Sequence, residues 1–387
     1  MFNFTTLPPL SLYIHIPWCV QKCPYCDFNS HEMGAGLLQK DYIAALLADL
    51  EQDLPRIWGR KVISIFIGGG TPSLFSPESL DFLLSGIRAR LNLVANCEIT
   101  MEANPGTVEA GKFAEFRSAG INRLSIGIQS FNDDALRRLG RIHGRKEAIF
   151  AAEQAHDAGF ESFNLDLMFG LPGQSLKMAA EDVATAIDLQ PAHLSYYQLT
   201  LEPNTRFHHQ PPALPNSDLI WEMQQQGQHA LAEAGFDQYE VSAYAQKGMS
   251  CRHNSNYWQF GDYLGIGAGA HAKISDAAQQ NITRLWKVKQ PAMYLGAASS
   301  LAVLGGEKVI PRNEVGLEFM MNALRLKEGF ETALFTEHTG LPITQVEAAL
   351  RRLEQKGLIE WGLHTIKTTE RGWQYLDTTI SEFLDEH

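Results

Sequence analysis

The sequence predicts an α/β fold whose parallel strands curl into a full or partial barrel, followed by a smaller C-terminal module. Short apolar runs rich in β-branched residues recur at intervals of roughly thirty residues, and amphipathic stretches such as 41–54 and 77–91 lie between them. The expected strands are 12–16, 62–67, 98–101, 123–128, 163–168 and 194–199. An open doubly wound sheet would show the same alternation, so periodicity alone leaves both arrangements open.

The chain beyond residue 199 is less regular. Four prolines between residues 203 and 215 mark a loop, which precedes an expected helix at 219–234 and an expected strand at 239–244. From Pro311 onward, the order of elements resembles a winged-helix module. Its expected helices are 317–326, 334–339 and 344–356, and its expected strands are 358–361 and 365–368. We therefore predict three regions: residues 1–235 as the barrel, 236–310 as a connecting region and 311–387 as a C-terminal domain.

Composition and charge restrict the class of partner. The 387 residues are 45% hydrophobic and 20% charged, which is ordinary for a globular protein. Lys and Arg number 32 against 44 Asp and Glu, so the formal net charge is -12. Because so acidic a surface repels phosphate backbones, we expect no nucleic-acid partner. The winged-helix-like region is itself acidic, which favours a packing or lid role over contact with DNA.

The cellular compartment is predicted from two further features. The first ten residues do not combine a basic segment with an apolar one, and no stretch approaches the ~20 apolar residues that cross a bilayer. Five cysteines in a chain of this length do not resemble the disulfide framework of a small secreted domain. We therefore expect a cytoplasmic protein.

Three of the five cysteines, Cys19, Cys23 and Cys26, fall within eight residues. Inert buried thiols usually occur singly, and a structural zinc ion wants a fourth protein ligand, for which only His15 or His31 lies near. An iron-sulfur cube accounts better for the spacing, because three thiolates bind three irons and leave the fourth iron open. S-adenosylmethionine could chelate that iron through its amino and carboxylate groups. A zinc-bound DNA regulator is the remaining, less favoured class.

Polar or glycine residues stand at the carboxyl end of several expected strands. These residues are Gly70, Thr71, Glu102, Gln129 and Asp166. In parallel α/β sheets the carboxyl ends of the strands meet at one face, where ligands bind. We expect these side chains to share a site with the cysteine loop, although capping and turn residues also collect at such positions.

The motif Cys-x3-Cys-x2-Cys on the loop after a first strand resembles the radical S-adenosylmethionine superfamily, whose fold is a partial or full (β/α) barrel. Further motifs resemble the oxygen-independent coproporphyrinogen III oxidase family over almost the whole chain. They are Tyr13-Ile-His-Ile-Pro-Trp-Cys, Gly68-Gly-Gly-Thr-Pro, Glu102-Ala-Asn-Pro, Gln129-Ser-Phe, Leu139-Gly-Arg-Ile-His and Asn164-Leu-Asp-Leu-Met-Phe-Gly-Leu-Pro. The resemblance implies an α/β partial barrel of the radical S-adenosylmethionine type, with a smaller C-terminal domain that resembles a winged helix.

The resemblance also implies roles for individual residues. Cys19, Cys23 and Cys26 would bind a [4Fe-4S] cluster. S-adenosylmethionine would lie between aromatic walls, beside a glycine turn and among polar groups that hold its ammonium, carboxylate and ribose hydroxyls. The aromatic walls are Tyr13 and Tyr25, the glycine turn is Gly70 and Thr71, and the polar groups are Glu102, Gln129, Arg141 and Asp166. A structural role remains open for each, and Arg141 could instead pair with Asp133 or Asp134.

Two departures from the oxidases bear on the function. The oxidases carry a further Cys two residues after the third ligand, where this chain has Phe28, and only twelve residues precede Tyr13 here. The pattern resembles instead a branch of the family implicated as heme chaperones, which bind heme and hand it to acceptor proteins, for which membrane-bound proteins are candidates. The alternative is a coproporphyrinogen III oxidase of porphyrin biosynthesis. A flavodoxin or ferredoxin would be the electron donor wherever the cluster is reduced.

The second half of the chain contains a candidate heme ligand. His253-Asn-Ser-Asn-Tyr-Trp matches the His-Asn-x-x-Tyr-Trp motif of that branch. Imidazole is a common axial ligand of heme iron, and the flanking aromatic rings could stack on the porphyrin. Cys251 is a rival ligand on the same face if the segment is extended, and the pair His208 and His209 is a weaker one. A core histidine held by hydrogen bonds is the structural alternative.

Overall fold

The computed structural model describes residues 2–34 and 38–384, and its centre is a twelve-stranded sheet in the order β14-β13-β12-β11-β1-β4-β5-β6-β7-β8-β10-β9. The strands from β11 to β8 in this order run parallel. They are β1 (Leu10–Ile16), β4 (Lys61–Gly69), β5 (Asn92–Ala103), β6 (Arg123–Gln129), β7 (Ser162–Phe169), β8 (His193–Gln198) and β11 (Asp262–Ile266). Because β14 and β9 are separate edges, the sheet does not close, and the expected partial barrel is confirmed.

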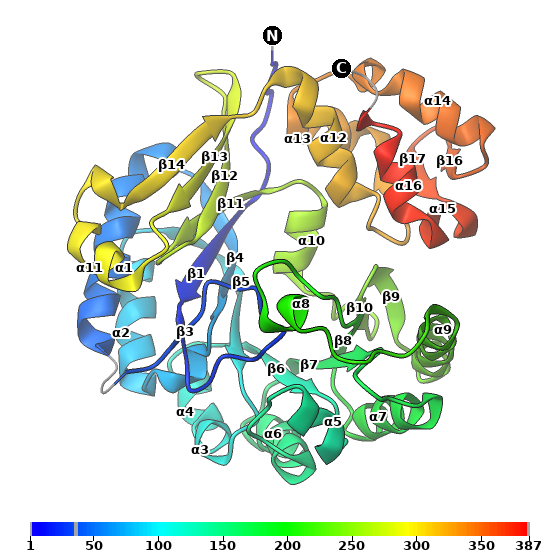
Figure 1. The fold of residues 1–387 in the computed structure, drawn as a ribbon. Coiled ribbons are helices and arrows are strands. Elements are labelled where there is room, and N and C mark those ends of the chain that lie inside the picture. The colour runs from blue at the N-terminus through cyan, green and yellow to red at the C-terminus, as the bar shows by residue number, and fades with distance from the viewer. Residues whose placement is uncertain (1, 35–37, 385–387) are drawn as a thin grey trace.

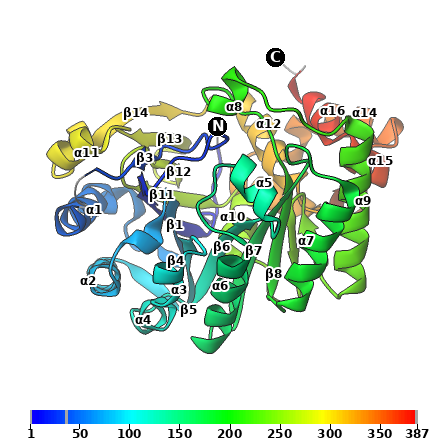
Figure 2. The same cartoon turned by 60° about the horizontal axis from the view of Figure 1, so that its bottom comes forward.

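Helices cover the convex side of this sheet (Figures 1 and 2). They are α1 (Gln39–Asp53), α2 (Pro77–Arg88), α3 (Thr107–Ala110), α4 (Phe113–Ser118), α6 (Arg145–Asp157), α7 (Leu176–Asp188) and α9 (Ser217–Glu233), whereas the short α5 (Asp133–Arg138) packs beside the cysteine loop. Ser76, Ser175 and Asn216 cap α2, α7 and α9 with side-chain oxygens, as N-cap residues do. The helices bury their apolar faces against outward-facing strand residues such as Leu12 and Ile14.

The concave side of the sheet is polar, since side chains alternate between the two faces of a strand. Ser11 and Ser64 meet there through their hydroxyls at 2.7 Å. On the neighbouring strands the Asn164 Oδ1 lies 2.7 Å from the His193 Nδ1, and the Asn164 amide donates to Ser125. The interior of this half-barrel therefore contains a network of hydrogen-bonded polar residues, and cavities lie at its carboxyl end.

The region predicted to connect the two domains adds strands to both edges of the same sheet. β9 (Asp237–Glu240) and β10 (Ala243–Ala245) extend it beyond β8, and β12 (His271–Asp276), β13 (Asn281–Lys287) and β14 (Leu304–Val309) extend it beyond β11. The single strand expected at 239–244 is wrong, because a turn at Val241 and Ser242 divides that run into β9 and β10, which pair antiparallel. The helices of this region are α10 (Arg252–Trp258) and α11 (Pro291–Ala297), whereas the short α8 (Arg206–His209) lies before it, in the loop that follows β8.

The C-terminal domain has helices packed against a three-stranded sheet in the order β15-β17-β16. Its elements are α12 (Arg312–Ala323), β15 (Phe330–Glu331), α13 (Thr332–Thr339), α14 (Glu347–Gln355), β16 (Ile359–Trp361), β17 (Thr365–Thr368), α15 (Glu370–Gln374) and α16 (Leu376–Ser381). Its hydrophobic core includes Phe4, Phe260 and Ile282 from the main body. The boundaries predicted near residues 235 and 310 stay predictions.

A membrane-spanning helix was not expected from the sequence. Among the residues described, none of the helices combines the length and the apolar character that crossing a bilayer requires.

Candidate functional site

The loop that follows β1 carries the three clustered cysteines across the carboxyl end of the sheet. Short strands β2 (Trp18–Cys19) and β3 (His31–Glu32) pair within it, and the Met33 amide donates to the Cys19 carbonyl at 2.9 Å. The Lys22 ammonium donates to the carbonyl oxygens of Phe28 and Ser30. The loop is therefore fixed by its own backbone groups before any ligand is considered.

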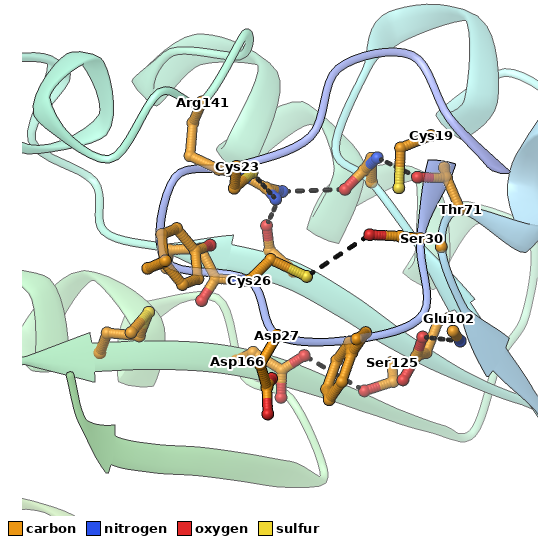
Figure 3. Close-up of a pocket in the computed structure, with 18 of the residues that line it drawn as sticks. Cys19, Cys23, Cys26, Asp27, Ser30, Thr71, Glu102, Ser125, Arg141 and Asp166 are labelled. Carbon is orange, nitrogen blue, oxygen red and sulfur yellow. Dashed lines mark hydrogen bonds between the residues drawn. The ribbon is translucent and has the colours of Figure 1, made fainter. Parts of the chain in front are cut away.

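Beneath this loop lies a cavity of about 250 Å³, called here the cysteine cavity. Seven of the nine predicted cofactor-contact residues line it together with the three cysteines: Tyr25, Gly70, Thr71, Glu102, Gln129, Arg141 and Asp166. Figure 3 shows the cysteines on the loop along one side and Glu102, Ser125 and Asp166 on the strands along the other. The structure thus brings together residues separated by up to about 150 positions in the sequence.

The glycine turn after β4 serves the cysteine loop as well as the cavity. The Gly70 amide donates to the Ile16 carbonyl and the Thr71 amide to the Trp18 carbonyl, each at 2.7 Å. A Cβ on Gly70 would collide with the backbone of Trp18, and Gly69 has a left-handed φ of +113°. Glycine is therefore required here for close packing of two backbones, in addition to any approach to a ligand.

Arg141 spans the floor of the cysteine cavity. Its guanidinium donates to the Asn104 Oδ1 at 2.8 Å and to the Gly127 carbonyl at 2.7 Å, and one nitrogen lies 3.7 Å from the Cys23 Sγ. The sequence left open a pairing with Asp133 or Asp134. Arg141 makes neither contact, since Asp134 pairs with Arg137 and Asp133 accepts from the Arg145 amide. Its cation is instead directed at a cysteine sulfur.

Two carboxyls of the cavity, those of Glu102 and Asp166, accept hydrogen bonds from neutral donors. Glu102 accepts a hydrogen bond from the Gly69 amide at 2.9 Å. Burial raises the pKa of Glu102 to about 7, and the nearby carboxylate of Asp166 contributes to this increase. Asp166 accepts from the Asn164 amide at 2.7 Å and from the Ser125 hydroxyl at 3.4 Å, and burial raises its pKa as well. Two carboxyls of raised pKa in one cavity would be stabilised by a cationic ligand group.

Gln129 has an unusual backbone conformation at the end of β6. Its φ of +69° is left-handed, which is strained for a residue with a side chain. The side-chain oxygen accepts a hydrogen bond from the Tyr197 hydroxyl at 3.0 Å. The surrounding residues therefore fix this amide at the cavity wall.

The donor set decides which kind of metal centre the cysteines fit. Nowhere in the described parts of the chain do three or more His, Cys, Asp or Glu side chains converge as one metal ion requires. The three thiols lie on one loop around one cavity, near the Arg141 cation and the Ser30 hydroxyl. This arrangement fits a polynuclear cluster, in which each sulfur binds a different iron, better than it fits a single zinc ion.

A second cavity of about 800 Å³, called here the histidine cavity, adjoins the first. The two cavities share Cys26, Phe28, Gly69 and Glu102 among their lining residues. Tyr13, expected beside the cluster, lines this second cavity, where its hydroxyl lies 3.0 Å from the His15 Nδ1. Its ring stacks on Phe66 at 6.3 Å.

His253 lines the histidine cavity from the first turn of α10. Its Nδ1 lies 3.3 Å from the Ser64 hydroxyl, and its ring centre lies 5.0 Å from that of Phe66. Its backbone amide donates to the Glu98 Oε1 at 3.1 Å. Since Nδ1 faces Ser64, Nε2 is the ring nitrogen left for a ligand.

The other candidate heme ligands, Cys251 and the pair His208 and His209, do not line the histidine cavity. The segment is helical and not extended, so Cys251 and His253 do not share a face, and the expectation that they might is wrong. Cys251 is fully buried, with its thiol donating to Glu98. His208 and His209 are exposed on α8 and line neither cavity.

The two aromatic residues of the motif have different surroundings. Tyr257 lines the histidine cavity and lies beside Tyr263, with ring centres 4.9 Å apart. Trp258 packs toward the C-terminal domain, where the Arg325 guanidinium lies 4.4 Å above its ring. Only Tyr257 is therefore placed to contact a ligand beside His253.

Several supporting residues were not assigned from the sequence. Asn104 donates to the Thr71 hydroxyl at 3.0 Å and accepts from Arg141, so it links two predicted site residues. Glu98 and Ser64 hold His253 from the strands beneath it. Asn104 belongs to the Glu102-Ala-Asn-Pro motif, which is a signal for it, whereas the sequence around Glu98 indicates only the start of a strand.

Comparisons with known proteins support the family resemblance. Residues 13–186 match the radical SAM superfamily, and residues 310–375 match the HemN C-terminal domain. A Haemophilus influenzae protein named heme chaperone HemW is 50% identical over 98% of this chain and 99% of its own length. The proteins of that name from Escherichia coli and Bacillus subtilis are 49% and 33% identical, over 98% and 97% of this chain and 99% of each relative.

A solved structure shares the fold. Coproporphyrinogen III oxidase HemN from Escherichia coli, described as a radical SAM enzyme, matches with a TM-score of 0.82 at 23% identity. The match covers 97% of this chain and 90% of that one. At this identity the likeness shows the fold alone, and it confirms the radical SAM architecture with an additional C-terminal domain.

Proposed function

Because this chain belongs to the heme chaperone HemW family within the radical SAM superfamily, we propose that it binds heme and transfers it to acceptor proteins. One observation supports this proposal most directly. A cavity of about 800 Å³, large enough for a cofactor, has the His253 imidazole in its wall and aromatic rings around it. This cavity adjoins the one beneath the three cysteines.

His253 is suited to the role of axial ligand. Burial lowers the pKa of His253 to about 4, so its imidazole is neutral near pH 7 and offers a lone pair to iron. Ser64 fixes the ring through Nδ1, and Phe66 and Tyr257 form walls on which a porphyrin can pack. In the proposed complex, Nε2 binds the heme iron.

Cys19, Cys23 and Cys26 would hold a [4Fe-4S] cluster in the cysteine cavity, with S-adenosylmethionine at the open iron. When bound, the cluster and this cofactor would supply one-electron chemistry beside the heme. The Arg141 guanidinium stabilises negative charge on the Cys23 sulfur. Glu102 and Asp166 offer carboxylates to an ammonium and to hydroxyls, and Tyr25 contributes an aromatic wall.

The partners follow from this proposal. The heme acceptors, for which membrane-bound proteins are candidates, would meet this chain in the cytoplasm. Wherever the cluster is reduced, a flavodoxin or ferredoxin would supply the electron. No nucleic acid is expected, since the chain carries a net charge of -12.

Heme titration of the purified chain tests the proposed ligand. Wild type should develop a Soret band, and His253→Ala should shift that band and weaken binding by about tenfold or more, because iron loses its imidazole ligand. His208→Ala is the matched control, since His208 is exposed outside both cavities. An identical spectrum and affinity in His253→Ala would exclude His253 as the ligand.

The oxidase activity can be examined separately. Phe28 lines both cavities at the position where the oxidases carry a further cysteine. We expect no carbon dioxide release when the anaerobically reconstituted protein, with reductant and S-adenosylmethionine, is incubated with coproporphyrinogen III. Catalytic release would assign the oxidase function instead.

A further inference from the structure

The histidine cavity has an imidazole and an ammonium group on the side opposite His253. His271 is the first residue of β12, and Lys289 follows the end of β13, the strand paired with β12. Both residues line the cavity. The Asn29 amide donates to the Lys289 carbonyl at 2.9 Å, so the cysteine loop fixes the backbone that carries this lysine.

Neither side chain has a polar partner among residues 2–34 and 38–384. The His271 ring stacks on Trp286 at 6.4 Å but makes no hydrogen bond, and the Lys289 ammonium makes no ion pair there. Other lysines of the same strands are fully paired: Lys273 with Asp262, and Lys287 with Asp49 and Asp53. Both side chains are exposed at the cavity wall, where Lys289 offers a positive charge and His271 an N–H donor to an anionic ligand.

The remaining charged groups of the cavity do not neutralise this pair. Asp27 and Glu102 are its acidic lining residues. Asp27 is exposed on the cysteine loop, and Glu102 already accepts from the Gly69 amide. Lys22 donates to two carbonyl oxygens of its own loop. His15 and His31 also line the cavity, and their Nε2 atoms lie 2.9 Å from the Asn29 carbonyl and 3.3 Å from the Asn29 Oδ1. Among the described basic residues that face His253 across the cavity, His271 and Lys289 are therefore left for a ligand.

The distance across the cavity suits a broad ligand. His253 packs on Phe66 of β4, whereas His271 stands on β12, and the sheet order between them is β4-β1-β11-β12. Three strand spacings of ~4.8 Å place these two positions roughly 14 Å apart. A flat macrocycle bound to His253 at its centre and lying over β1 and β11 would direct one edge toward His271 and Lys289.

We propose that His271 and Lys289 form a subsite for the propionate carboxylates of heme. This inference rests on the proposed function, since it requires heme in the histidine cavity. A lysine ammonium and a carboxylate form a charge-assisted hydrogen bond, and the histidine adds an N–H donor. The subsite orients the porphyrin so that its polar edge faces the basic pair and its apolar edge faces Phe66 and Tyr257.

A ligand that lacks the carboxylates provides the test. Heme and heme dimethyl ester are titrated into wild type and into the double variant H271A/K289A. Wild type should bind heme about tenfold more tightly than the ester, and the double variant should bind both with the affinity that wild type shows for the ester. The single variant Lys289→Arg should keep part of the preference for heme over the ester. Lys308→Ala, on the outer strand β14, should leave this preference unchanged.

Two results would overturn the subsite. Wild type could bind the ester as tightly as heme, or the double variant could lose affinity for both ligands equally, as a purely structural defect would cause. Failure of the proposed function gives a different pattern. If wild type discriminates between heme and ester but His253→Ala binds both as wild type does, the subsite stands and the axial ligand is wrong. If wild type binds neither, both proposals fall.

Discussion

Glu98 connects the interior of the sheet to the proposed heme ligand. Its carboxylate accepts the backbone amides of Arg252 and His253 at 3.0 and 3.1 Å, and it accepts the Cys251 thiol. These amides belong to the first turn of α10, which has no partner for them within the helix. Glu98 therefore fixes the position of His253 although it does not reach the cavity, and it is a positioning residue.

The variant Glu98→Gln should loosen this turn. A neutral amide keeps one acceptor but loses the charge, so we expect the free energy of unfolding to fall by about 1–3 kcal/mol and heme to bind several-fold more weakly with a broadened Soret band. Urea denaturation and heme titration measure the two effects. Glu51→Gln is the control, because Glu51 forms only an exposed ion pair with Arg90. An unchanged heme spectrum in Glu98→Gln would contradict the positioning role.

Glu102 predicts a pH dependence of stability. Its pKa is about 7 in the folded protein because of burial, against ~4.3 when unfolded. Between these values the folded state holds a proton that the unfolded state has lost, so stability falls as the pH rises. Glu102→Gln should therefore unfold at higher urea concentration than wild type at pH 8, and the two should nearly coincide at pH 4.5. An equal difference at both pH values would contradict the assignment.

At the scale of elements, the site depends on how closely the cysteine loop packs on the turn after β4. Since a Cβ on Gly70 would collide with the Trp18 backbone, Gly70→Ala should displace the loop. After anaerobic reconstitution we expect this variant to retain less than half the iron of wild type, as measured by iron and sulfide content. Gly296→Ala is the control, because nothing lies within 4 Å of its Cβ and alanine favours the helix by about 0.5–1 kcal/mol. Full iron content in Gly70→Ala would disprove the steric argument.

The parallel strands could be predicted from the sequence because each is a local pattern. Each of the six expected runs overlaps an observed strand, although β5 begins at Asn92, six positions before the expected start at residue 98. The side chains of the cysteine cavity could be predicted for the same reason, since they stand at strand ends that the parallel topology brings together. The local sequence was sufficient wherever one strand and its following turn determine the position of a side chain.

Helix α10 shows where such reasoning fails. Its seven residues include Asn and Ser, which are weak helix formers, and an isolated helix this short is not stable. Its first turn is stabilised by Glu98, about 150 positions earlier in the chain, and Asn256 donates to Ser11 and to the Asp262 carbonyl. These contacts are long-range, so no local pattern could show that Cys251 and His253 face apart.

At the scale of the whole molecule, the C-terminal domain shares its core with the part that carries His253. Phe260 follows α10 directly and packs against Phe319 of α12, with ring centres 5.7 Å apart. The His338 Nδ1 lies 2.6 Å from the Gln259 carbonyl, and Arg284 pairs with Glu318. The domain therefore supports α10 from outside the sheet while Glu98 supports it from inside, which agrees with a packing role.

Replacement of Phe260 tests this coupling. Phe260 is 1% exposed, and Phe260→Ala should lower the free energy of unfolding by about 3–5 kcal/mol, because it leaves a cavity between the two parts. Position 260 has a left-handed φ of 58°, and the resulting backbone strain is the same for Phe and for Ala. The loss of stability therefore measures the contribution of the aromatic ring. Phe82→Ala, at a position 63% exposed, should change stability by less than about 0.5 kcal/mol. If the domains are coupled as this core implies, urea unfolding of Phe260→Ala remains one transition and heme affinity falls with it. A separate early transition of the C-terminal domain, with heme binding intact, would show that α10 does not depend on it.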